Sequence, residues 1–220
     1  MGNDFEFRIG MTTQQVISSI SRTNATDKTK QMIINFCNND QDKKISDEVE
    51  LTMLNSWASG SEKITMPAEP KDKPLSVETY KYRTLKTYKA GNADKISFAR
   101  FTNGTNVFTS FPATQSKYDT QNQLIDTDGD GYADRRETTY DDYAGYGDNT
   151  IIRYYDNNLD GSYDKKNETI YKHDKKDTRL YNETNLDTGE TKNFRIWYNN
   201  KQQEWTSHPK TDLEKLDDWY

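Results

Sequence analysis

A twelve-residue acidic stretch, residues 126–137, constrains this chain of 220 residues more than any other feature. Its first, third, fifth, sixth, ninth and twelfth positions are Asp126, Asp128, Asp130, Gly131, Asp134 and Glu137. Alternating carboxylates of this kind point inward when the chain curls round a hard cation, and the glycine permits the sharp turn. Without a cation, carboxylates this close repel one another. The spacing therefore predicts a cation site, and the alternative is an acidic surface turn that binds nothing.

This stretch resembles the loop of EF-hand calcium-binding proteins, for which the same spacing is typical. The resemblance implies four side-chain ligands for Ca²⁺, namely Asp126, Asp128, Asp130 and Glu137. It also implies that Tyr132 offers its backbone carbonyl and that Asp134 binds directly or through water. Similar acidic loops occur in bacterial surface and secreted proteins with calcium-stabilised repeats. The resemblance covers acidic loops only and identifies no family for the whole chain.

A second acidic segment repeats the pattern with a weaker set of ligands. Its first, third, fifth and ninth positions are Asp156, Asn158, Asp160 and Asp164. Glu168 follows one residue after the twelfth position, so it is out of step with the glutamate of the first loop. We expect a weaker calcium site here, and the alternative is an Asp-Gly turn that simply suits a β-hairpin. Together the two segments predict a repeat of strand, acidic loop and strand.

A third candidate loop lies between two predicted helices. Its potential weak ligands are Asn38, Asp40, Asp42, Lys44 and Glu48. The segment resembles an EF-hand helix-loop-helix, with Ile45 at the apolar eighth position. Lys43 replaces the glycine of the sixth position, and Val49 stands where the bidentate glutamate belongs, between Glu48 and Glu50. The helix-loop-helix shape is expected, with the ion either bound or lost.

The first sixty residues are predicted to be helical. Thr12 and Gln15 have the spacing of a capping box ahead of an amphipathic segment. A second helix is predicted to begin near Thr26 or Asp27. Ser46 is the predicted N-cap of a third helix.

The pattern changes from helix to strand after a segment broken by three prolines, which is predicted to be a linker or an extended crossing segment. Asn103-Gly104 between apolar runs predicts a hairpin. The acidic loops are flanked by Tyr, Ile and Thr, which favour strands over EF-hand helices. The predicted fold is α+β, and its parts are an EF-hand-like helical domain (residues 1–60), a linker (61–78) and an antiparallel β domain (79–220). Calcium loops form the hairpin tips, and a short helix is expected near residues 211–216.

The amino-acid composition limits the classes of function that this chain can have. Only 31% of the residues are hydrophobic and the mean hydropathy is −1.15, so we expect a thin core that bound ions help to hold together. The 15 Tyr, 8 Phe and 4 Trp can supply an aromatic core. Residues 117–190 contain 10 Lys and Arg against 18 Asp and Glu, a net charge of −8. This acidic half is not expected to bind nucleic acid, because phosphates would be repelled.

No catalytic motif stands out in the chain. The single cysteine, Cys37, excludes an intramolecular disulfide and is expected to be a small buried residue. His173 and His208 are too far apart for a zinc motif, and there is neither a nucleophile elbow nor a phosphate loop. We therefore expect a calcium-stabilised, non-catalytic binding or structural module with a protein or glycan partner. A calcium sensor and a calcium-dependent hydrolase are the alternatives.

The cellular location that we expect for the protein follows from the calcium affinity expected of its loops. Loops of this kind suit millimolar calcium, so we expect an extracellular or cell-surface protein, with the cytoplasm as the alternative. No apolar run reaches the length of a transmembrane helix, and the N-terminus has no signal-peptide core. If the protein is exported, we expect a signal outside this sequence.

Overall fold

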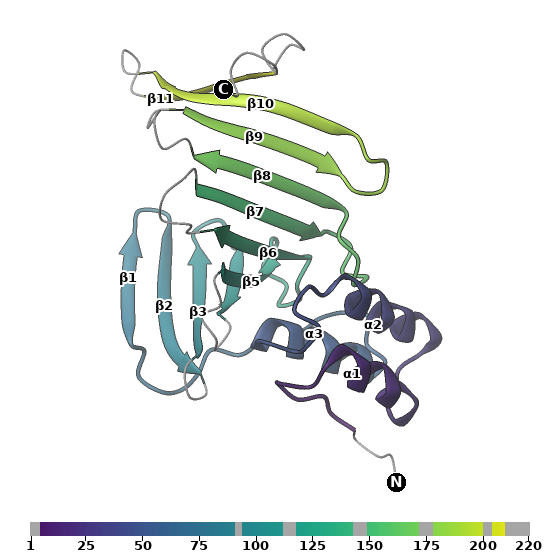
Figure 1. The fold of residues 1–220 in the computed structure, drawn as a ribbon. Helices are drawn as coiled ribbons and strands as arrows, with labels where there is room; N and C mark the ends of the chain where they lie inside the picture. The colour runs from purple at the N-terminus through teal and green to yellow at the C-terminus, as the bar shows by residue number, and fades with distance from the viewer. Residues whose placement is uncertain are drawn as a thin grey trace. The chain divides into compact units, whose positions relative to one another are not determined.

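The computed structural model describes residues 5–90, 94–111, 118–142, 149–171, 178–199 and 204–209. Three α-helices come first, and eleven strands follow in these ranges. The helices are α1 (Thr13–Ser19), α2 (Asp27–Asn39) and α3 (Glu48–Ala58), with a 3-10 turn at Ile20–Arg22. They lie together as one group in Figure 1. An α+β fold that is mainly β is therefore confirmed.

The strands are hydrogen-bonded to one another in sequence order, from β1 to β11. Their bounds are β1 (Ser76–Tyr80), β2 (Arg83–Ala90), β3 (Asp94–Phe101), β4 (Asn106–Ser110), β5 (Tyr118–Asp126), β6 (Arg135–Asp142), β7 (Asn149–Asp156), β8 (Lys165–Tyr171), β9 (Thr178–Asn185), β10 (Thr191–Asn199) and β11 (Glu204–Pro209). The ladders from β1 to β5 and from β8 to β11 are antiparallel throughout. This confirms the predicted antiparallel sheet.

The chain divides into two compact units. The first comprises Met1–Gln115, Thr120–Thr138 and Tyr155–Tyr163, and the second comprises Ser116–Asp119, Thr139–Tyr154 and Asp164–Tyr220. The predicted division into a helical domain, a linker and a β domain stays a prediction. The helix predicted near residues 211–216 lies outside the described part of the chain.

The first two helices begin at the capping residues that the sequence predicts. Thr12 Oγ1 accepts from the Gln15 N–H at 3.2 Å, and Gln15 Oε1 accepts from the Thr12 N–H at 2.9 Å. This is the reciprocal capping box of α1. The Thr26 hydroxyl accepts from the Thr29 N–H at 3.2 Å and so caps α2. Both caps satisfy N–H groups that would otherwise lack a partner at a helix start.

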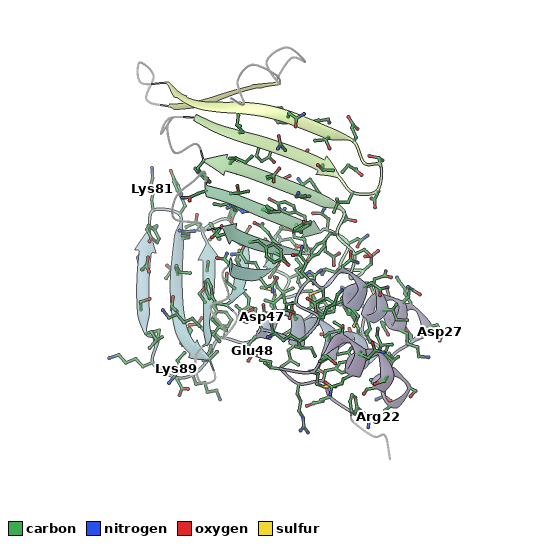
Figure 2. The ribbon with its side chains drawn as sticks, viewed as in Figure 1. Arg22, Asp27, Asp47, Glu48, Lys81 and Lys89 are labelled. Carbon is green, nitrogen blue, oxygen red and sulfur yellow. The ribbon has the colours of Figure 1, made fainter. Side chains whose placement is uncertain are left out.

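The N-cap of α3 is Asp47, so the prediction of Ser46 is wrong by one residue. Asp47 Oδ1 accepts from the N–H groups of Val49 and Glu50 at 2.9 and 3.1 Å. A carboxylate is also favoured here because the N-terminus of a helix carries partial positive charge. Ser46 instead donates its N–H and hydroxyl to Glu50 Oε2 at 2.7 and 3.0 Å. Figure 2 shows Asp47 at the start of α3.

The helices of the first unit share one apolar core with strands β2 to β5. Phe36 of α2 meets Trp57 of α3 edge to face at 6.4 Å between ring centroids. Phe98 of β3 lies against Phe108 of β4 at 5.1 Å. Strands β3 and β4 form the predicted hairpin, in which Gly104 has a φ of +97° that the turn requires. Aromatic contacts thus form part of this core, and aliphatic side chains make up the rest of it.

Part of the proline-containing segment before β1 runs beside the first acidic loop. The Ala133 N–H donates to the Ile64 carbonyl at 2.9 Å, and the Met66 N–H donates to the Gly131 carbonyl at 2.9 Å. The side chain of Ile64 is fully buried. This stretch is therefore extended and paired, as one of the two predictions for the segment has it.

The second acidic loop packs closely on α2 at Gly161. A Cβ added to Gly161 would lie 2.3 Å from the carbonyl oxygen of Met32 and 2.8 Å from the backbone nitrogen of Phe36. The amide groups of Asn35 and Asn39 donate to the carbonyls of Asp160 and Gly161, each at 3.4 Å. Only glycine fits at this approach of two backbones.

We predict that Gly161→Ala destabilises the protein more than Gly10→Ala does. The two glycines have almost the same φ, +89° and +90°, but nothing lies within 4 Å of a Cβ at Gly10. The control should cost about 1–2 kcal/mol from backbone strain alone. Gly161→Ala should cost a further ~1–3 kcal/mol because the loop must move away from α2. Urea unfolding of both variants measures the difference, and equal losses would show that the close approach does not matter.

Candidate metal centre

The first acidic loop brings three carboxylates together. One oxygen each from Asp126, Asp128 and Asp130 lies within 4.8 Å of the other two. Asp126 is the last residue of β5 and is fully buried, while the other two side chains are exposed. Three of the predicted ligands thus converge at the end of a strand. Within the described ranges, this is the only group of three or more His, Cys, Asp or Glu residues so close together.

The side-chain carboxylate of Asp126 organises the loop by accepting hydrogen bonds from backbone N–H groups within it. Its Oδ1 accepts from the Gly129 N–H at 2.7 Å, and its Oδ2 accepts from the Gly131 N–H at 3.1 Å. The amide of Asn106 on β4 also donates to Oδ2 at 3.2 Å. These bonds fix the carboxylate in one orientation before any ion binds. Gly131 has the positive φ, +89°, that the sixth position of the loop was expected to need.

Asp128 and Asp130 stabilise the curved backbone of the same loop in a similar way. Asp128 Oδ1 accepts from the Asp130 N–H at 3.1 Å, and Asp130 Oδ1 accepts from the Tyr132 N–H at 2.8 Å. Tyr132 also forms a β-bridge with Thr65, and the Lys63 ammonium lies 4.7 Å from the centre of its ring. The neighbouring extended segment therefore holds the residue whose carbonyl is the predicted backbone ligand.

The remaining two predicted ligands of this loop lie outside the group of three. Asp134 Oδ2 accepts from the Thr127 N–H at 2.6 Å and from the Thr127 hydroxyl. These hydrogen bonds lower the pKa of Asp134, so its carboxylate stays ionised. Glu137 lies in strand β6, so no EF-hand helix follows the loop. A flanking strand is what the composition of the flanks predicts.

Among the described residues, the three carboxylates have no cationic partner. In the part of the chain that the structure describes, the ion pairs do not include Asp126, Asp128 or Asp130. Three carboxylates in contact repel one another unless a cation or protons neutralise them. Chemically, the loop offers an all-oxygen site for a hard cation.

The second acidic loop has a similar pattern of hydrogen bonds from backbone N–H groups to its first carboxylate, but that carboxylate also pairs with an arginine. Asp156 Oδ1 accepts from the Asp160 N–H at 3.2 Å, and Oδ2 accepts from the Gly161 N–H at 3.1 Å. In addition, Arg136 Nη2 lies 3.7 Å from Asp156 Oδ2, with 2% and 0% of the two side chains exposed. The positive charge that a cation would bring to Asp156 is thus supplied by an arginine from β6.

Aromatic rings hold Arg136 in this position. Its guanidinium carbon lies 5.2 Å from the centre of the Phe36 ring on α2 and 4.6 Å from that of Tyr163. Both distances fall in the range of cation–π attraction. The role of Arg136 is not visible in the sequence, because nothing in the pattern of the first loop marks its eleventh residue as the ion-pair partner of Asp156 in the second loop.

The other predicted ligands of the second loop are spread over both units. Asn158 Oδ1 accepts from the Asp160 N–H at 3.0 Å, and Asp160 Oδ1 accepts from the Ser162 N–H at 2.8 Å. Asp164 and Glu168 belong to the second unit. There Glu168 Oε2 accepts from the Asn182 amide at 3.0 Å. A calcium site formed by Asp156, Asn158, Asp160, Asp164 and Glu168 stays a prediction.

The loop between α2 and α3 buries some of its predicted ligands and exposes others. Asp40 is buried, Asn38 and Asp42 are exposed, and Lys44 and Glu48 are half-buried. The Lys44 N–H donates to Asp42 Oδ1 at 3.1 Å. Lys43 has a φ of +59°, so a lysine takes the backbone conformation expected of the missing glycine.

A buried polar chain connects α3 to the strands and to the second acidic loop. The Asn122 amide donates to Asp47 Oδ2, and the Thr138 hydroxyl donates to Asn122 Oδ1 at 2.5 Å. The Tyr163 hydroxyl donates to Thr138 Oγ1 at 3.1 Å. Burial raises the pKa of Asp47 and the pKa of Tyr163. The chain is a structural network, since hydrogen bonds within the protein occupy its members.

Comparison of the chain with protein-family models, with curated proteins and with solved structures gives no match. Among the described residues, the helices are too short and too polar to cross a membrane.

We predict that Arg136→Met lowers the free energy of unfolding by about 3–5 kcal/mol, because it leaves the carboxylate of Asp156 buried without its partner. Adding Asp156→Asn should recover part of this loss, since the buried charge is then gone. Arg8→Met, at an exposed arginine, is the control and should change little. Urea unfolding is measured for the unmodified protein, Arg136→Met, Asp156→Asn, the double variant and Arg8→Met. Additive losses in the double variant would contradict the ion pair.

Proposed function

We propose that this chain binds Ca²⁺ at residues 126–137 and that the ion stabilises a non-catalytic binding or structural module. One observation carries the proposal: three carboxylate oxygens of Asp126, Asp128 and Asp130 lie within 4.8 Å of one another. Ca²⁺ takes about six to eight oxygens, at roughly 2.3–2.6 Å from the ion. The loop offers half of such a shell, and the Tyr132 carbonyl, Glu137, Asp134 and water can complete it.

The chemistry of the donors favours calcium over other common ions. The three clustered side chains offer oxygen alone, whereas zinc sites in proteins rely mainly on histidine and cysteine. Magnesium binds in a smaller octahedral shell and releases its water reluctantly, which suits an irregular loop poorly. We therefore expect the loop to bind calcium more tightly than magnesium.

A structural role is favoured over a switch. The loop is tied to its surroundings by the Asn106 amide and by backbone hydrogen bonds to Ile64 and Met66. A bound ion would stabilise that arrangement rather than create a new one. A sensor would need the helices to separate, but Phe36 and Trp57 share the core with the strands, and Gly161 rests directly on α2.

The proposal includes an extracellular or cell-surface location and a protein or glycan partner. Millimolar calcium outside cells suits a site with only a few charged ligands. Tyr80 and Tyr82, at the β1–β2 hairpin, are 49% and 61% exposed, and such rings are common in contacts with partners. These two tyrosines support a binding surface on the first unit.

Calcium titration tests the site directly. Asp128→Asn and Asp130→Asn each remove one charge without changing volume, so each should abolish or greatly weaken one class of binding in calorimetry. Glu137→Gln should weaken the same class. Asp27→Asn is the control, because the Asp27 side chain is fully exposed and far along the sequence. Unchanged stoichiometry and affinity in all three loop variants would refute the site.

Removing calcium tests the structural role. Ion binding to the folded state alone adds about 2.7 kcal/mol at a hundredfold excess over Kd. In chelator, limited proteolysis should therefore cut first near residues 126–137, while α1 to α3 stay intact. Mass spectrometry of the fragments gives the order of cutting. First cuts near residues 38–48 would instead indicate a calcium-dependent helix pair, as in a sensor.

A further inference from the structure

Strand β1 (Ser76–Tyr80) lies at one edge of the sheet. It is first in the strand order, and among the described strands it is hydrogen-bonded to β2 alone (Figure 1). All five residues of the strand are exposed. The side of β1 away from β2 is therefore a free edge, whose backbone N–H and C=O groups can pair with a strand of another chain.

The register of β1 and β2 shows which backbone groups face this free edge. Tyr80 pairs with Arg83 across a two-residue turn, so these two residues exchange backbone hydrogen bonds. Hydrogen-bonded pairs alternate along an antiparallel ladder, so Glu78 is bonded to β2 in the same way. The N–H and C=O groups of Val77 and Thr79, which alternate with these residues, point away from β2. Each of the two offers a donor and an acceptor to a further strand.

The sequence of β1 lacks the features that usually protect an edge strand. Sheets commonly place Lys or Pro within an edge strand, which hinders pairing with other chains. The five residues of β1 include neither. Eight large apolar side chains are exposed in the described ranges, and half of them lie in residues 75–82, namely Leu75, Val77, Tyr80 and Tyr82. Apolar surface concentrated in this way is typical of a contact with a partner.

The hairpin of β1 and β2 is basic in an acidic protein. Residues 71–90 contain six Lys and Arg against two Asp and Glu, a net charge of +4, whereas the whole chain has −6. One of the six, Lys86, pairs with Glu69 at 2.7 Å. The other five are exposed and belong to no ion pair among the described residues, namely Lys71, Lys73, Lys81, Arg83 and Lys89. Charge complementarity therefore favours an acidic partner.

The exposed cations lie at the two ends of β1 rather than along it. Lys73 precedes the start of β1, and Lys89 lies near the end of β2, which the antiparallel ladder places beside that start. Lys81 and Arg83 lie at the turn, at the other end of β1. Figure 2 shows Lys81 and Lys89 at opposite ends of the hairpin. Because Glu78 lies in the middle of β1, a partner segment should be acidic at both ends and neutral between them.

We propose that the free edge of β1 binds an extended segment of a partner protein that is acidic at both ends and apolar in its middle. The segment adds to the sheet as a further strand. Its backbone pairs with Val77 and Thr79, and its acidic ends meet Lys73 and Lys81. A polypeptide is favoured over a glycan because its backbone carries N–H and C=O groups at the spacing of a strand. This mode of binding rests on the proposed binding function, whose partner it defines, and does not involve residues 126–137.

A synthetic peptide tests the free edge in the full chain. The probe has glutamates at both ends of a core that alternates valine and threonine, and fluorescence anisotropy measures its binding. Amide hydrogen exchange at Val77 and Thr79 should slow when the probe binds, because water reaches these N–H groups in the free protein. Exchange at Glu78 should change little, since its N–H is already bonded to β2. The same peptide with N-methyl groups throughout its core cannot donate backbone hydrogen bonds, so it should not bind.

Charge variants test the acidic ends of the partner. Lys73→Glu together with Lys81→Glu should weaken binding of the probe roughly tenfold, because two exposed attractions become repulsions. Arg8→Glu together with Lys192→Glu is the matched control, since it changes the net charge equally at exposed residues in other parts of the chain. Dextran sulfate is the comparison ligand. If it binds more tightly than the probe, and loses that binding in the β1 variant, the partner is an anionic glycan and the peptide is overturned.

The outcomes separate this mode of binding from the calcium site. Absence of probe binding, equal binding of the N-methylated peptide, or no protection at Val77 and Thr79 overturns strand addition. Equal binding by the Lys73→Glu, Lys81→Glu variant overturns the acidic partner. Calorimetry with CaCl₂ measures the calcium loop independently, and Asp128→Asn should bind the probe unchanged. Calcium binding without probe binding therefore refutes the free edge alone, and probe binding without calcium binding refutes the calcium site alone.

Discussion

The guanidinium of Arg136 connects three parts of the first unit that are far apart in the sequence. It extends from β6, lies between the rings of Phe36 and Tyr163, and pairs with Asp156. A buried ion pair is rarely a net source of stability, because both charges must leave water. We infer that its value lies in specificity, since a misplaced loop would leave both charges buried without a partner. Gly161, in the same loop as Asp156, makes the close approach to α2.

The two acidic loops show how one sequence pattern can serve two electrostatic situations. Each begins at the last residue of a strand, Asp126 of β5 or Asp156 of β7, and each folds back its own N–H groups onto that first carboxylate. Asp126 then meets the neutral amide of Asn106, whereas Asp156 meets Arg136. The difference comes from residues outside the loops, so loop spacing alone cannot reveal it.

What could be predicted from the sequence was local. The capping box of Thr12, the Asn103-Gly104 turn and the clustering of Asp126 with its neighbours each depend on residues a few positions apart. The prediction that was wrong concerned a residue whose partner is distant in the sequence. Asp47 replaces Ser46 as the cap of α3, and its second carboxylate oxygen accepts from the amide of Asn122 on β5.

The acidic residue that faces the loop before α3 could not be chosen from the pattern either. Glu48, Val49 and Glu50 are adjacent, and the phase of the helix decides which of them turns inward. That phase follows from the cap at Asp47 and from the burial of Val49. A shift of one residue in the cap therefore exchanges one glutamate for another.

The order of the strands has a consequence for how the chain reaches its fold. Because each strand is hydrogen-bonded to its neighbours in sequence, the β ladders close only short loops. Low contact order of this kind favours rapid folding, since little loop entropy is lost before each pairing forms. The contact between α2 and the second acidic loop differs from these ladders, because it joins residues more than a hundred positions apart in the sequence. Docking of that loop on α2 closes a longer loop than any strand pairing does, so we expect it to form later than the β ladders.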